Sequence, residues 1–282
     1  MGWISRQFST RVIVLIPVAI AINIVLGYTV QTVLKLPIYL DSIGTILVGV
    51  LAGPLAGALT GVLTNLIWQY APVIGGGTIG PFAITAGVIG FLAGIWGYLG
   101  VFRPRPASGT QLLVAAIAAA ALAILVVVPL ISNPVYLDPD VGGFVAWAVP
   151  AAIAIAIIVA IVVAGFIYVR RDLAGLWVAV AGIVTGVIAA IVSAPIAAIV
   201  FEGVTGSGTD LIVAALRQGG ADVLAASLGQ GFFSDPIDKL ITFFVVFLIL
   251  VSLSSRFLAR FPLGERLTRP APGAVPSADS QS

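Results

Sequence analysis

The stretch that decides the fold is DSIGTILVGVLAGPLAGALTGVLTNLIWQY, from Asp41 to Tyr70. It is too long for one straight membrane-spanning helix, because roughly 20 residues cross about 30 Å of hydrocarbon. Gly53-Pro54 lies near its middle, and a proline inside a helix kinks or breaks it. The stretch is therefore either one long kinked helix or a short helix (41–52) that turns back at Gly53-Pro54 into a second one (55–70).

Apolar runs of membrane-spanning length lie on both sides of this stretch. They cover residues 12–33, 81–102, 111–131, 144–169, 173–201 and 236–255. The chain of 282 residues is 60% hydrophobic and only 9% charged, whereas roughly a quarter of the residues in a soluble domain are charged. These features predict an all-α, polytopic transmembrane bundle in the plasma or inner membrane. It has seven spans if residues 41–70 form one helix and eight if they form a hairpin.

The positions of the basic residues favour eight spans. Basic residues prefer the cytoplasmic side of a membrane, and Arg6 and Arg11 place the N-terminus there. With eight spans, both termini are cytoplasmic and ten of the thirteen basic residues lie inside. With seven spans, Arg103, Arg105, Arg170 and Arg171 would move outside. A helix of only twelve residues rises about 18 Å, so the short second helix would require tilt or a locally thinner bilayer.

The remaining segments define the domain boundaries. Residues 1–10 are expected to be a cytoplasmic N-terminal segment, 11–261 the transmembrane domain, and 262–282 a disordered cytoplasmic tail. Residues 202–234 are too polar and glycine-rich to span. We expect two short helices there, over 210–217 and 221–228, across the extracellular mouth of the bundle.

Several kinds of chemistry are excluded by composition. Cysteine and histidine are absent, which removes thiolate and imidazole metal ligands and histidine-dependent triads. Neither Lys35 nor Lys239 follows a G-x-x-x-x-G sequence, so there is no P-loop. We therefore predict no enzyme activity, no cofactor, no metal site and no nucleic-acid partner.

Small residues recur at helical spacing in two places. Gly53, Gly57 and Gly61 stand four apart, and so do Ala19, Asn23 and Gly27. Such rows let helix backbones approach closely in a membrane. They indicate either packing inside the bundle, with a hydrogen bond from Asn23, or docking onto the helices of a partner.

Polar residues near the span ends are the candidate site. Asp41 precedes an apolar run and could cap a helix or face a ligand. Asp235, before Pro236, has the form of an N-cap with proline as first helical residue. Asn65 and Gln69 share a helix face beside Trp68. These three residues and Tyr39 are candidate pocket walls, although interfacial aromatic residues are often membrane anchors.

The glycine-rich loop 203–210 superficially resembles a phosphate cradle. No strand precedes it, no lysine follows, and Asp210 would repel an anion. Helix caps and a flexible turn explain the loop, and a role in an extracellular lid stays open.

Five runs together resemble the substrate-binding S components of energy-coupling-factor (ECF) transporters, in an uncharacterised branch. They are LPIYLDSIGTI (36–46), GPLAGALTG (53–61) with Asn65, SAPIAA (193–198), GVTGSG (203–208) and SDPIDK (234–239). The resemblance implies capture of a vitamin-like or other small water-soluble molecule from outside. It also implies partners: a coupling transmembrane subunit, reached through small residues of the first helix, and two ATPase subunits. The loop 34–41 would gate the site.

The alternative function is a ligand-sensing membrane module that does not transport. For either function, a pocket formed by Tyr39, Asn65, Trp68 and Gln69 would suit a neutral or cationic ring. Asp41 and Asp235 would favour a cation if they face inwards.

Overall fold

The fold is entirely helical over the part of the chain that the structure describes. The structure is a computed structural model that describes residues 2–34, 36, 38–70, 79–107, 109–132 and 142–269. No strand occurs within these ranges, and the only extended pairing there is an isolated bridge between Pro106 and Asp172. The prediction of an all-α protein is confirmed for these ranges.

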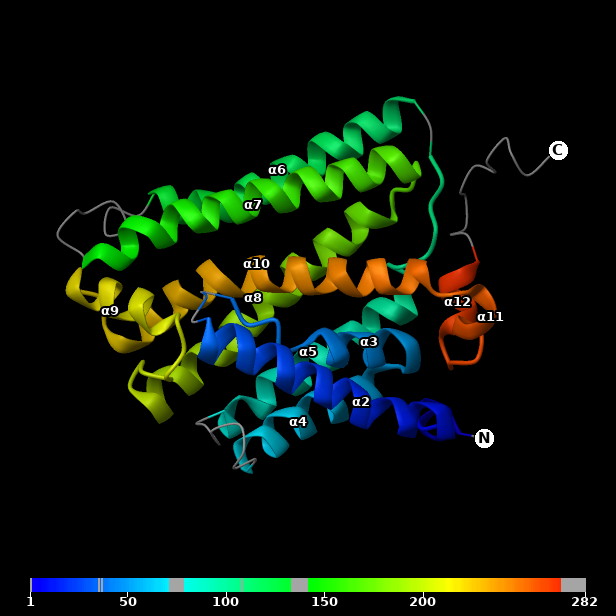
Figure 1. Cartoon of the computed structure of the whole chain (residues 1–282), viewed down its shortest axis with the longest axis horizontal. Coiled ribbons are helices and arrows are strands. Elements are labelled where there is room, and N and C mark those ends of the chain that lie inside the picture. Colours follow the sequence, from blue (N-terminus) through cyan, green and yellow to red (C-terminus); the bar gives the residue numbers. More distant parts are fainter. Residues whose placement is uncertain are drawn as a thin grey trace.

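All the long helices except α10 follow the apolar runs of the sequence closely (Figure 1). The long helices are α2 (Thr10–Gly27, extended by the π-helical segment η1, Tyr28–Val33), α3 (Ile43–Ala52), α4 (Pro54–Tyr70), α5 (Ala83–Leu99, preceded by the short η3, Gly80–Phe82), α6 (Thr110–Ser132), α7 (Gly142–Arg170), α8 (Ala174–Phe201) and α10 (Val223–Ser252). The described residues also form four short helices: α1 (Trp3–Gln7), α9 (Asp210–Gln218), α11 (Ser255–Leu258) and α12 (Gly264–Thr268).

Three helical segments are long and apolar enough to cross a membrane. Within the part of the chain that the structure describes, they are Thr10–Val33, Gly80–Leu99 and Ala174–Phe201. Their exposed side chains include Val14, Val18 and Ile191, which lipid rather than water can cover. These segments indicate a membrane protein.

The Gly53-Pro54 stretch forms two helices. The helix α3 ends at Ala52, Gly53 adopts a φ of 121°, and α4 begins at Pro54. A Cβ placed on Gly57 would lie 2.7 Å from the Cα of Gly49, so α4 runs back along α3. Of the two interpretations of this stretch, the structure has the hairpin and not the single kinked helix.

Close glycine contacts bring the helices together. A Cβ on Gly90 of α5 would lie 2.1 Å from the carbonyl oxygen of Gly57 in α4, and one on Gly186 of α8 would lie 2.5 Å from that of Asp235 in α10. Lipid gives no hydrophobic drive for helices to associate, so contact between backbones of this kind is an important source of packing energy in a membrane.

The row Ala19, Asn23 and Gly27 packs inside the bundle. Ala19 and Asn23 have no exposed surface, and a Cβ on Gly27 would lie 2.7 Å from the ring of Trp68. The Asn23 amide donates to Thr45 Oγ1 at 2.8 Å and to Thr64 Oγ1 at 3.1 Å. In this conformation the row does not offer a surface to a partner, contrary to the docking prediction. Of the two interpretations of the row, the structure supports packing inside the bundle.

The central helix α10 differs from its prediction. It runs without a break from Val223 to Ser252, with Pro236 inside it. Its N-cap is Asp222, whose Oδ1 accepts a 2.7 Å hydrogen bond from the N–H of Ala225. The prediction that Asp235 caps a helix beginning at Pro236 is therefore wrong, and so is the separate helix over 221–228. The other predicted short helix, 210–217, corresponds to α9.

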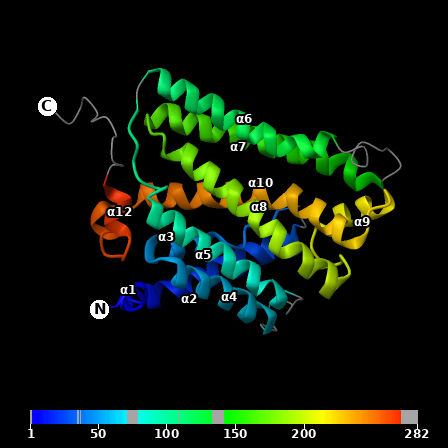
Figure 2. The same ribbon diagram turned by 180° about the vertical axis from the view of Figure 1, so that it is seen from behind.

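The helix ends next to most of the arginines lie at one end of the molecule, at the right of Figure 1, together with α1, α11 and α12. Hydrogen bonds join this end: Arg11 donates to the carbonyl of Arg260, and Arg266 to that of Tyr98. We call it the arginine end. The arginines that lie in or next to these helix ends in the sequence are Arg6, Arg11, Arg103, Arg105, Arg170, Arg171, Arg256, Arg260, Arg266 and Arg269. Figure 2 shows the same grouping from behind.

The folded part extends beyond the predicted start of the tail at residue 262. The N–H of Leu263 donates a 2.9 Å hydrogen bond to the carbonyl of Leu51, and Leu267 of α12 is buried. The tail prediction is wrong for residues 262–269. Its remainder, 270–282, lies outside the described residues, as does Lys35.

Candidate functional site

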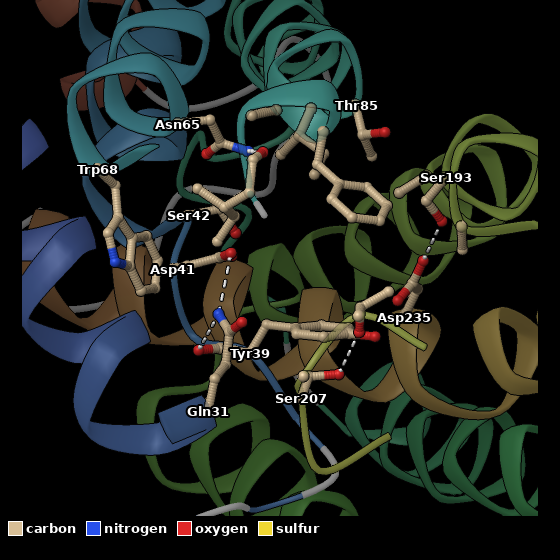
Figure 3. A pocket seen from close by; sticks show the side chains of 18 of the residues that line it. Gln31, Tyr39, Asp41, Ser42, Asn65, Trp68, Thr85, Ser193, Ser207 and Asp235 are labelled. Carbon is tan, nitrogen blue, oxygen red and sulfur yellow. Dashed lines mark hydrogen bonds between the residues drawn. The ribbon is translucent and has the colours of Figure 1, made fainter. Parts of the chain in front are cut away.

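A cavity of about 530 Å³ lies among η1, α4, α5, α8, α10 and the segment before α3. The segments that line it lie away from the arginine end (Figure 1). Its volume is within the range of roughly 300–1,000 Å³ that is usual for small-molecule sites. The walls combine carboxylates, amides, hydroxyls and aromatic rings (Figure 3). They include Gln31, Tyr39, Asp41, Ser42, Asn65, Trp68, Gln69, Phe82, Thr85, Ser193, Ser207, Gln230, Asp235 and Lys239.

All six predicted substrate-binding residues line this one cavity. Tyr39 and Asp41 come from the segment before α3, and Asp235 comes from α10. The other three, Asn65, Trp68 and Gln69, come from the last two turns of α4. The fold thus brings together residues nearly 200 positions apart in the chain.

Asp41 faces the cavity and does not cap α3. The N-cap of α3 is Ser42. One carboxylate oxygen of Asp41 accepts a 3.1 Å hydrogen bond from Gln31 Nε2, and the other lies 3.9 Å from Lys239 Nζ. Burial raises the pKa of the Asp41 carboxyl above its ordinary value, and the nearby Lys239 ammonium partly opposes this effect.

A buried ion pair in α10 holds the segment before α3 against the cavity. Lys239 Nζ lies 2.5 Å from Asp238 Oδ2 and donates to Ser42 Oγ at 2.9 Å. The other oxygen of Asp238 accepts hydrogen bonds from the backbone N–H groups of Tyr39 (2.9 Å) and Leu40 (2.8 Å). Asp238 is therefore saturated with donors, and Lys239 is largely neutralised by it.

The negative charge of the Asp235 carboxylate is less well compensated than that of Asp238. Asp235 is 5% exposed, and its oxygens accept only long hydrogen bonds, from Ser193 Oγ at 3.4 Å and Ser234 Oγ at 3.3 Å. Within the described residues no lysine or arginine forms an ion pair with it. Figure 3 shows its side chain beside Ser193, across the cavity from Asp41.

The phenol of Tyr39 connects the two sides of the cavity. It accepts a 2.9 Å hydrogen bond from Gln230 Nε2 and donates one of 3.2 Å to Thr209 Oγ1. Burial raises the pKa of Tyr39 above its ordinary value, so the phenol stays protonated and can act as this donor.

The side-chain amides of Asn65 and Gln69 in α4 hold the backbone just before α5. Gln69 Oε1 accepts the N–H of Gly80 at 2.8 Å, and Asn65 Nδ2 donates to the carbonyl of Ile79 at 3.4 Å. Beyond this entry, Thr85 lines the cavity, is 7% exposed, and its Oγ1 has no hydrogen-bond partner among the described residues. A buried hydroxyl without a partner is costly.

The loop 203–210 contributes Thr205, Gly206 and Ser207 to the lining. Asp210, the first residue of α9, accepts hydrogen bonds from the N–H of Gly206 at 2.6 Å and from Thr205 Oγ1 at 2.7 Å. These hydrogen bonds give the loop a fixed place beside the cavity.

The sequence analysis missed several lining residues, among them Gln31, Thr85, Ser193, Gln230 and Lys239. A signal for Gln230 exists in α10, where Gln230, Ser234, Asp238 and Thr242 stand four apart. Such spacing places side chains on one helix face. Because the predicted helix begins at Pro236, Gln230 and Ser234 fell outside it and this polar face was not recognised.

No protein-family model, curated protein or solved structure matches this chain.

Proposed function

We propose that this protein is the substrate-specific membrane subunit of an ECF-type importer. It would capture a vitamin-like or other small water-soluble molecule from outside the cell. It would then deliver the molecule together with a coupling transmembrane subunit and two ATPases. The observation that carries the proposal is the cavity of about 530 Å³ with polar and aromatic walls, whose lining residues come from helix segments away from the arginine end.

The distribution of charge sets the direction of capture. If the arginine end is cytoplasmic, as the positive-inside rule favours, all eight long helices cross the membrane in alternate directions and both termini are inside. The cavity then lies towards the outer surface, with the 203–210 loop and residues 39–42 beside it. This is the arrangement that a capturing subunit requires.

Energy for release would come from the partners, because the sequence contains no P-loop. Since Ala19, Asn23 and Gly27 are buried, contact with the coupling subunit would use other side chains. Enlarging a residue of this row would not test docking. A Cβ on Gly44 would lie 2.2 Å from the Ala19 carbonyl oxygen, so the larger side chain of Ala19→Leu would disturb the packing of the bundle itself.

The proposal is tested by mass spectrometry of small molecules released from the purified protein. Ala86→Phe adds a ring at the cavity wall, whereas Ala21→Phe adds the same ring on the exposed face of α2. We expect a compound that is retained by the wild type and by Ala21→Phe and is lost from Ala86→Phe. Its uptake by cells should require the coupling subunit and the ATPases.

Other results would count against an importer. Retention of a compound without any uptake in the presence of these partners would favour the ligand-sensing module. If no compound is retained by any of the three proteins, a substrate-capturing role is contradicted.

A further inference from the structure

The charges around the cavity do not balance. Three carboxylates, those of Asp41, Asp235 and Asp238, lie close to a single ammonium, that of Lys239. The Lys239 ammonium is 2.5 Å from Asp238 and 3.9 Å from Asp41, so it compensates the first carboxylate fully and the second in part. With all four groups ionised, this leaves two negative charges in excess of the positive charge.

Asp235 carries most of the uncompensated charge. Its donors are two serine hydroxyls at 3.3 Å or more, and neutral donors at this distance are weak substitutes for water or a cation. Asp41, by comparison, has the Gln31 amide at 3.1 Å as well as Lys239. A positive charge entering the cavity would therefore gain most beside Asp235.

A second observation indicates a ligand in the same space. Thr85 Oγ1, on the wall formed by α5, is buried and has no partner among the described residues. A buried hydroxyl normally has a hydrogen-bond partner, and a bound molecule would supply one here. The same molecule would also lie within reach of the rings of Tyr39, Trp68 and Phe82, which line the cavity.

A metal ion does not fit these features. No group of three or more acidic side chains placed to hold a metal ion occurs in the described ranges. Asp41 and Asp235 lie on different sides of the cavity in Figure 3. A space of about 530 Å³ walled partly by aromatic rings is suited to an organic molecule, and aromatic faces attract organic cations.

We infer that the substrate is an organic cation, whose positively charged nitrogen pairs with Asp235 and whose ring lies among the aromatic side chains of the cavity. This inference rests on the proposed function, because it names the class of molecule that the same site would capture. Asp41 would add a weaker attraction, since Lys239 already compensates part of its charge.

The test uses three sets of ring compounds with matched shapes and different charges. The cations are tyramine and tryptamine, the neutral compounds are their N-acetyl derivatives, and the anions are the corresponding arylacetates. Binding at millimolar concentration is measured by calorimetry and by thermal shift on the purified full chain. We expect the cations to bind, with Asp235→Asn weakening them by on the order of 30-fold or more and Asp41→Asn weakening them less.

The matched control is Asp222→Asn. It removes one carboxylate from the same chain but keeps a good helix N-cap, and Asp222 is not part of the cavity lining. Cation binding should be unchanged in this variant. The melting temperature of each unliganded variant shows whether it has folded, and Asp41→Asn provides a second measurement if Asp235→Asn does not fold.

The outcomes separate the two proposals. If the neutral compounds or the anions bind and the cations do not, the inference fails while substrate capture stands. Cation binding that is equal in the wild type, Asp235→Asn and Asp41→Asn also contradicts the inference. If no compound of any charge binds and mass spectrometry finds no retained molecule, the proposed function fails and the inference fails with it.

Discussion

The carboxylate of Asp238 in α10 accepts a 2.8 Å hydrogen bond from the backbone N–H of Leu40, which lies 198 residues earlier in the chain. Leu40 has a φ of 53°, a left-handed conformation that costs a non-glycine residue roughly 1–2 kcal/mol. Asp238 also accepts the N–H of Tyr39. The central helix thus holds the segment before α3 in a strained conformation that turns Tyr39 and Asp41 towards the cavity.

Asp238→Asn should destabilise the protein. The substitution removes the closest negative charge from buried Lys239, whose other carboxylate neighbour, Asp41, is 3.9 Å away. Removing one partner of a buried ion pair costs about 3–5 kcal/mol. Denaturant unfolding in detergent micelles should show a loss of this size, and Asp222→Asn should show none. Equal stability of the two variants would contradict the structural role given to Asp238.

The pH dependence of stability should change in Asp41→Asn. Because the pKa of Asp41 is raised in the folded protein, its contribution to stability is complete below the ordinary value of 3.8 and is lost as the pH rises through the folded-state pKa. Asparagine has no such charge. We therefore expect Asp41→Asn to melt at a higher temperature than the wild type at neutral pH, with a smaller difference in acid.

Melting curves from about pH 4 to about pH 8 measure this effect, since the relevant window begins near the ordinary carboxyl pKa and extends above it. The curves should be recorded without ligand. A melting temperature that falls in Asp41→Asn at neutral pH would mean that the contacts of Asp41 with Gln31 and Lys239 outweigh the cost of burying its charge.

Alanine substitutions at two helical glycines should have opposite effects. A Cβ on Gly186 would lie 2.5 Å from the Cα of Pro236, so Gly186→Ala forces α8 away from α10. Among the described residues, no atom beyond the neighbouring backbone of α7 lies within 4 Å of the Cβ position of Gly165, where alanine adds about 1 kcal/mol of helix propensity. Thermal unfolding should show lower stability for Gly186→Ala and unchanged or higher stability for Gly165→Ala. The reverse order would rule out the close contact between α8 and α10.

The helices and much of the site could be predicted from the sequence because both depend on local patterns. Apolar length locates the long helices, and Gly53-Pro54 marks the break because a glycine with positive φ is needed there. Asn65 and Gln69 are recognisable as one helix face. Each of these signals lies within a few residues of its consequence.

The course of α10 could not be predicted in the same way. A proline after an aspartate favours a helix start locally, but the tertiary contacts of Gly182 and Gly186 with the backbone at residues 235–240 keep the helix continuous through Pro236. The contact between Lys239 and Ser42 also cannot be predicted from the local sequence, because the two residues are 197 positions apart. Which small-residue row faces the interior likewise depends on long-range hydrogen bonds, such as that of Asn23 with Thr45.

The orientation of the protein can be tested with single cysteines, because the chain has none of its own. Arg217 in α9 and Arg256 in α11 are both exposed, and they lie at the cavity end and the arginine end, respectively. We expect an impermeant maleimide to label Arg217→Cys on intact cells and to label Arg256→Cys only after permeabilisation, with the cysteine-free wild type as the control. We expect this orientation because ten of the thirteen basic residues lie at the arginine end. The opposite orientation would place them outside the cell, against the positive-inside rule. Labelling of Arg256→Cys from outside would place the cavity towards the cytoplasm, where a subunit that captures extracellular molecules could not use it.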